Sequence, residues 1–434
     1  MKEFIRYVSL NVMGMIGLSC YILADTFFVA QAEGASGLAA LNYGIPVYSV
    51  MYGIGLMLGI GGATRFSISQ GKKQKDGNRD DTSLSHAVYM GLAVSLCIWM
   101  VSLLVSRPLA GLLGAEGDTL ALTNTYISTI MWFAPFFILN NILIAFVRND
   151  GNPKLAMIAM LVSSLSNILF DYIFMFPFKM GMFGAALATG SSPLVSILIV
   201  SKHLRSKKCS FRFRRCRLSA PVMGNILACG FSALIAELAS AVALITFNLV
   251  IVNLKGDMGV AAYGIVANIA LVATSIFTGV AQGIQPLVSR YYGSGDTEEL
   301  NRVVKRGILT VLVSSVLIFA VLMAGMKGII AVFDRDNHPA LREMAEQGMK
   351  LYFIGYFFAG TNIMAVTVLS AAAKVKAAFA ISNLRSWCLF VPVILLMSRL
   401  FAMGGVWCSF PVTEFLILLI SAPVLIHYMK RWYV

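Results

Sequence analysis

Long apolar stretches recur along the whole chain, and short polar segments separate them. A helix needs roughly 20 apolar residues to cross the hydrocarbon layer of a membrane. Stretches of about this length lie at 7–31, 38–66, 84–106, 121–146, 154–176, 182–203, 222–252, 259–287, 303–327, 349–370, 376–400 and 402–429. The pattern therefore predicts an all-α polytopic membrane protein with about twelve transmembrane helices.

Composition supports this interpretation. The 434 residues are 58% hydrophobic and only 12% charged, whereas a soluble domain carries about 25% charged residues. So few charges cannot cover a water-facing surface, which excludes an ordinary soluble globular protein.

The distribution of positive charge predicts the topology. The net charge is +14, and 26 of the 34 Lys and Arg residues fall on the side of the N-terminus when the predicted helices alternate. Because Lys and Arg concentrate in cytoplasmic loops, we expect a multi-pass protein of the cell (inner or plasma) membrane with both termini cytoplasmic. The basic block at 202–217 is interpreted as a loop near anionic lipid headgroups, so no nucleic-acid partner is predicted.

The second half of the chain repeats the first at an offset of 222 residues. Eight residues of the first half recur as the same residue type 222 positions later. The pairs are Gly37 and Gly259, Ala39 and Ala261, Ala40 and Ala262, Gly61 and Gly283, Ser67 and Ser289, Gly71 and Gly293, Lys154 and Lys376, and Ala156 and Ala378. Repeats of six helices share one orientation and are related by an axis along the membrane normal. We predict two pseudo-symmetric six-helix bundles, 1–203 and 221–434, joined by a basic cytoplasmic linker at 204–220, with a central cleft.

Four acidic residues fall within the predicted helices: Asp25, Asp171, Glu237 and Glu414. An ionisable group in a membrane costs several kcal/mol and usually marks a transport pathway. No Lys or Arg is predicted at comparable depth, so these carboxyl groups could hold a proton near neutral pH or receive a cation. The alternative is that each one bonds a neighbouring helix in its protonated form, and this alternative is favoured for Glu414.

Two further observations concern chemistry. Asn167 lies four residues before Asp171 and so on the same helix face, from which its amide could orient the carboxylate. The chain has seven Cys without a CxxC pair, and its four His are not clustered along the sequence. No catalytic residue, metal site or disulfide framework is therefore predicted.

Several segments, taken in order, resemble the multidrug and toxic compound extrusion (MATE) family. They are Ala24–Thr26 with Gly37–Leu41, Arg148–Met157, Asn167–Asp171 with Gly181–Thr189, Glu237, and Gly283–Leu287 with Tyr292–Asp296. The resemblance implies two six-helix bundles around a cleft. It also implies export of cationic or amphipathic organic compounds by antiport with H⁺ or Na⁺, without a cofactor.

The resemblance further implies a set of cation- and substrate-binding residues: Asp25, Asn167, Asp171 and Thr189 in the first half, Asn141 as a looser match, and Glu237 in the second half. Some family members carry an Asp in helix ten, where this chain has only Asn362. A cation site that uses that Asp is therefore not expected, and H⁺ is the preferred coupling ion.

Two other classes of function fit these residues less well. A lipid-linked oligosaccharide flippase of the same superfamily would favour Arg and Lys in its cleft, to bind pyrophosphate. A membrane enzyme would need clustered catalytic or metal-binding residues. Transport of small cationic molecules by a monomer within the lipid bilayer is the prediction carried forward.

Overall fold

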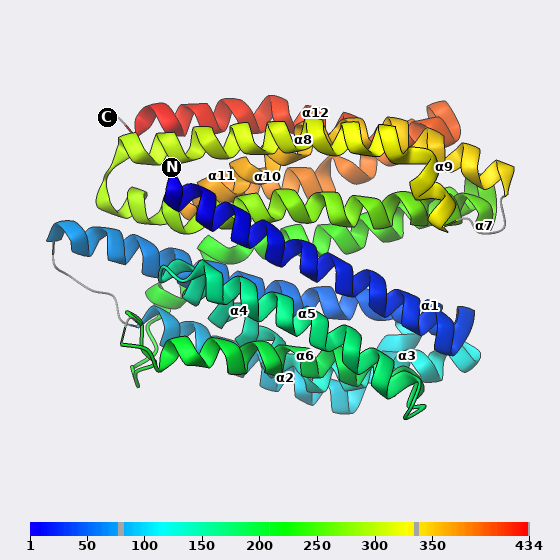
Figure 1. The fold of residues 1–434 in the computed structure, drawn as a ribbon, viewed down its shortest axis with the longest axis horizontal. Helices are drawn as coiled ribbons and strands as arrows, with labels where there is room; N and C mark the ends of the chain where they lie inside the picture. Colours follow the sequence, from blue (N-terminus) through cyan, green and yellow to red (C-terminus); the bar gives the residue numbers. More distant parts are fainter. Residues whose placement is uncertain (77–81, 208, 334–337, 433–434) are drawn as a thin grey trace. The chain divides into compact units, whose positions relative to one another are not determined.

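The computed structural model describes residues 1–76, 82–207, 209–333 and 338–432, and within these ranges every regular element is helical (Figure 1). This confirms the all-α class. The helices are α1 Lys2–Asp76, α2 Ser83–Leu112, α3 Gly117–Trp132, α4 Ala134–Asn149, α5 Pro153–Met175, α6 Gly181–Leu204, α7 Ala220–Ser294, α8 Thr297–Phe333, α9 Pro339–Tyr352, α10 Tyr356–Ala371, α11 Val375–Asn383 and α12 Phe390–Arg431. A 3₁₀ turn, Phe353–Gly355, precedes α10, and a π-helical segment, Leu384–Cys388, precedes α12.

In the described part of the chain, ten helical segments are long and apolar enough to cross a membrane, or eleven when the bent pair α3 and α4 is counted as one. That pair bends by 50°, where Pro135 in the first turn of α4 cannot donate a backbone hydrogen bond. One of the ten, Val375–Arg431, has 57 residues, about twice the length of a single span. It contains a break at Ala402, where φ is +49°, beside the predicted boundary between two helices.

Breaks in the helices recur at the repeat offset. Gly34 in α1 has φ +63° and ψ −149°, and Gly256 in α7, 222 positions later, has φ +59° and ψ −155°. The same offset joins Gly151, with φ +83°, to Ala373, with φ +54°. Glycine adopts this left-handed region without a steric penalty, whereas other residues rarely do. The two halves therefore share special backbone conformations as well as residue types.

The chain divides into two compact units. Unit 1 comprises Met1–Leu238 with Ser289–Gly295, and unit 2 comprises Ala239–Val288 with Asp296–Val434. In unit 1, α5 packs against α1, α4 and α6, and α2 against α3 and α4; in unit 2, α10 packs against α8, α11 and α12 (Figure 1). The division of domains at 204–220 stays a prediction, and Lys208 within that linker lies outside the described residues.

Within unit 1, α1 and the start of α7 meet backbone to backbone. A Cβ atom at Gly61 would overlap the carbonyl oxygen of Ile226, and one at Gly230 would overlap that of Met57. Small residues permit such close approach between helices in a membrane, where packing rather than hydrophobic burial drives association. The glycines at this contact are therefore required by the fold.

Gly230→Ala should lower the free energy of unfolding by about 2 kcal/mol, because inserting a methyl group into a packed contact costs 1–3 kcal/mol. Gly224→Ala in the same helix is the matched control, since a Cβ there would meet nothing within 4 Å. The measurement is thermal unfolding of the three proteins in one detergent. Equal melting temperatures for Gly230→Ala and the unmodified protein would contradict the close contact.

Candidate site at a buried carboxyl pair

The packing of α1 on α5 brings two of the predicted acids together. A Cβ at Gly17 of α1 would overlap the Leu161 side chain of α5, so the two helices are closely packed there. About three turns further along both helices, Phe28 lies 6.4 Å from Tyr172 and 5.9 Å from Phe176, measured between ring centres. Contacts that advance in the same direction on both helices mean that they run parallel.

Asp25 and Asp171 lie between these two contacts. Asp171 is fully buried and Asp25 is 6% exposed, and they are close enough for like charges to repel. In the described part of the chain, Oδ1 of each carboxyl group has no hydrogen-bond partner, and no basic side chain acts electrostatically on either. Because an ionised carboxylate is costly in an apolar interior unless it is paired, this pair can accept a proton or a cation.

Asn167 and Thr189 complete one side of the pair. When the Asn167 amide is oriented to satisfy both of its ends, its nitrogen donates to Asp171 Oδ2 at 3.1 Å and its oxygen accepts from the Thr189 backbone N–H at 3.3 Å. Both residues are buried. In this orientation the amide connects α5 to α6 and donates to the Asp171 carboxylate, and the role of Asn167 at the site stays a prediction.

The other two predicted residues lie elsewhere in unit 1. The Asn141 amide donates to its own helix, at the Phe137 carbonyl oxygen 3.2 Å away, and no contact joins it to the carboxyl pair among the described residues. Glu237 is half-buried in α7, and a Cβ at Gly53 of α1 would lie 3.3 Å from Glu237 Cβ. The structure therefore groups four of the six residues closely and places Asn141 and Glu237 outside that group.

Tyrosines that the sequence analysis did not select lie near the acids. Tyr21 and Tyr48 share a hydrogen bond of 2.9 Å between their hydroxyl groups, and Tyr48 stacks on Tyr52 with ring centres 5.6 Å apart. Tyr21 is within electrostatic range of Asp25, Asp171 and Glu237. Its position one helical turn before Asp25 was the available signal, because residues four apart share a helix face.

In unit 2, Glu414 has a basic partner, so the expectation that no Lys or Arg lies as deep as the acids was wrong there. Arg385 Nε and Nη2 each lie 2.8 Å from Glu414 Oε1. Asn362 Nδ2 donates to Oε2 at 2.8 Å, and Ser421 Oγ donates to Asn362 Oδ1 at 2.6 Å. Arg385 lies in the π-helical segment, whose departure from α-helical periodicity changes which way side chains point.

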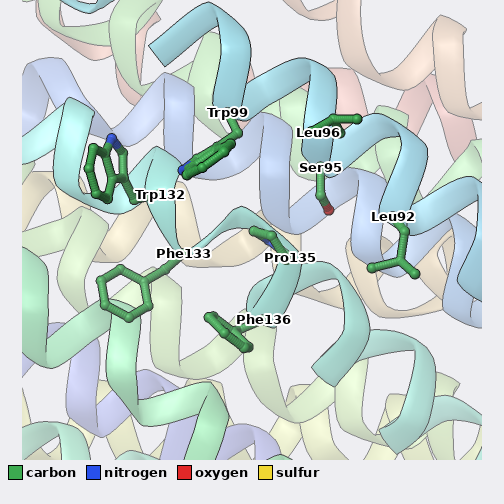
Figure 2. A pocket seen from close by; sticks show the side chains of 8 residues that line it. All are labelled: Leu92, Ser95, Leu96, Trp99, Trp132, Phe133, Pro135 and Phe136. Carbon is green, nitrogen blue, oxygen red and sulfur yellow. The ribbon is translucent and has the colours of Figure 1, made fainter. Parts of the chain in front are cut away.

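An apolar groove of about 580 Å³ lies where α2 passes the bend between α3 and α4 (Figure 2). Trp99 and Trp132 meet edge to face at its rim, with ring centres 5.9 Å apart. The one polar side chain in its lining, Ser95, donates to the Gly91 carbonyl oxygen of its own helix. None of the predicted site residues lines this groove, so it is not the candidate site.

Comparison with known proteins places this geometry in context. The MatE family model matches residues 12–173 and 233–396. The multidrug export protein MepA of Staphylococcus saprophyticus is 27% identical over 413 residues, which cover 95% of this chain and 90% of that protein. The protein of the same name from Staphylococcus aureus is 28% identical, with the same coverage.

Two solved structures share the fold. An outward-facing multidrug resistance MATE family transporter of the MOP superfamily superposes with a TM-score of 0.93 at 20% identity, covering all of this chain and 96% of that one. A MOP superfamily transporter from Pyrococcus furiosus Vc1, reported to have a binding pocket of reverse polarity, gives a TM-score of 0.92 at 20% identity with the same coverage.

A helical membrane protein with this fold and these relatives is a transporter rather than an enzyme. The chain belongs to the MatE family, because the family model matches most of its length. The resemblance found in the sequence is thereby confirmed.

The Arg385–Glu414 pair generates a prediction about stability. Arg385→Met should lower the free energy of unfolding by about 3 kcal/mol, at the low end of the range for breaking a buried ion pair, because the Arg385 side chain keeps 23% exposure. The double variant Arg385→Met with Glu414→Gln should recover part of the loss, since no buried charge then lacks a partner. Additive losses in thermal unfolding would show that the two side chains do not interact.

Proposed function

We propose that the protein exports cationic or amphipathic organic compounds by antiport with H⁺, and that the Asp25–Asp171 pair carries the exchange. The names of the MepA relatives support multidrug export as the activity. The observation that carries the proposal is the pair itself: two buried carboxyl groups whose like charges repel each other, each with an unpartnered oxygen.

The chemistry of the pair favours exchange. Two neighbouring carboxyl groups cannot both be ionised without a cation near them, because their like charges repel in a low dielectric. A bound organic cation and a bound proton relieve the same repulsion, so binding of one favours release of the other. Asn167 holds Asp171 in place during the exchange.

Alternating access couples this exchange to transport. Protonation of the pair in an outward-open state releases the organic cation outside. The transporter then opens inward, and loss of the proton to the cytoplasm restores the carboxylate. Only the differential affinity of the two states for proton and cation drives the cycle, so no cofactor is required.

The tyrosine cluster of Tyr21, Tyr48 and Tyr52 suits an organic cation better than an inorganic one. Aromatic faces attract organic cations and also bury their apolar parts.

The protein is proposed to act as a monomer in the cell membrane. Both of its termini are proposed to be cytoplasmic, as the distribution of Lys and Arg predicts.

Asp171→Asn should reduce efflux of a fluorescent cation such as ethidium from cells at least tenfold, because the amide cannot exchange a proton. Asp118→Asn is the matched control, since Asp118 is exposed in the first turn of α3. Membrane levels of all three proteins are measured in parallel. Efflux by Asp171→Asn at the unmodified level would remove the pair from the mechanism.

The coupling ion is tested in proteoliposomes that hold the purified protein. An imposed pH gradient should drive uptake or release of ethidium, and an imposed Na⁺ gradient at constant pH should not. If only the Na⁺ gradient moves ethidium, then Na⁺ rather than H⁺ is the coupling ion. No movement under either gradient, with folded protein, would favour the flippase alternative and would make a labelled lipid-linked sugar the next substrate to test.

A further inference from the structure

Three potential metal ligands meet in unit 1, on segments outside the proposed transport site. Asp150 follows the last residue of α4, His203 lies in the last turn of α6, and Cys209 follows α6 in the chain. One ligand atom from each lies within 4.8 Å of the other two. The Asp150 and His203 side chains are 5% and 4% exposed, and Cys209 is 8% exposed.

We propose that Asp150, His203 and Cys209 bind a Zn²⁺ ion. A carboxylate oxygen, an imidazole nitrogen and a thiolate sulfur form a donor set that favours Zn²⁺ over harder cations such as Mg²⁺ and Ca²⁺. Bond lengths of 2.0–2.3 Å place tetrahedral ligands about 3.5 Å apart. The three atoms reach that spacing through shifts on the order of 1 Å, and a water molecule takes the fourth position.

Charge balance favours the ion in this buried place. One carboxylate and one thiolate together carry two negative charges and the neutral imidazole carries none, so the site with bound Zn²⁺ is neutral. Binding releases the Cys209 thiol proton to solvent, and the site takes no part in redox chemistry. Zinc affinity should therefore fall as the pH is lowered, because protons compete for the same ligands.

The hydrogen bonds of Asp150, His203 and Cys209 show which contacts a bound zinc ion would replace. His203 Nε2 lies 2.8 Å from Asp150 Oδ2, and the Cys209 thiol donates to the Phe211 carbonyl oxygen at 3.0 Å. Ser210 donates to Asp150 from its backbone N–H at 2.9 Å and from its hydroxyl group. The ion takes the place of the Asp150–His203 bond, and the bonds from Ser210 can remain to orient the carboxylate.

A second consequence involves the start of α5. His203 Nδ1 lies 3.3 Å from Asn152 Nδ2, and Asn152 Oδ1 accepts from the Leu155 N–H to cap α5. Zinc on Nε2 places the imidazole proton on Nδ1, so the Asn152 amide must turn its oxygen toward that proton and release the cap. The ion thus connects to the helix that carries Asp171, although it does not contact Asp171.

The test uses the purified full-length protein in detergent with any polyhistidine tag removed. The protein is stripped with a chelator, dialysed against buffered Zn²⁺, and analysed for bound zinc by mass spectrometry. We expect about one zinc per chain, at least tenfold less at the same free Zn²⁺ in Cys209→Ser and His203→Gln, and no change in Cys216→Ser. Cys216 is the matched control because it lies in the same linker and outside the cluster.

Loading with Co²⁺ gives a second readout that does not depend on the folding of a variant. A thiolate-to-cobalt absorption band in the unmodified protein and in Cys216→Ser would support the site. Absence of the band, or zinc retained by Cys209→Ser at the unmodified level, would overturn the proposal. Either result leaves the transport proposal standing, because efflux through Asp25 and Asp171 does not require the ion.

Discussion

The close contact between α1 and α5 sets the separation of the two carboxyl groups at the candidate site. A Cβ at Gly17 would overlap Leu161, and one at Gly14 would lie 3.1 Å from the Met160 sulfur. Larger side chains at these glycines would push the helices apart and with them Asp25 from Asp171. The repulsion that makes the pair sensitive to a proton or a cation depends on that separation.

The two halves share a backbone design but differ in chemistry. Gly34 and Gly256 break their helices in the same conformation, which indicates equivalent folds. Among the described residues of unit 1, Asp25 and Asp171 have no basic partner, whereas in unit 2 the Arg385 guanidinium neutralises Glu414. A neutralised carboxylate gains little from a further cation, which is why the proposed exchange is assigned to the Asp25–Asp171 pair and not to Glu414.

The segment at 204–220, which connects α6 to α7, also packs against other parts of unit 1. Phe211 is buried against Phe66 and Phe146. The Arg214 backbone N–H donates to Ser85 Oγ, and the Ser219 N–H donates to His86 Nε2. These contacts fix the segment against unit 1 and bring Cys209 to Asp150 and His203, while its Arg side chains remain on the outside.

Hydropathy by itself determined that the chain is helical and spans a membrane, because burial of the backbone in lipid requires helices of a fixed length. It also singled out Asp25 and Asp171, since an acid in an apolar stretch is conspicuous whatever lies beside it. Only the tertiary structure decided which acids have partners. Arg385 meets Glu414, and His203 meets Asp150, across 29 and 53 residues of sequence, and such contacts depend on helix packing rather than on local periodicity.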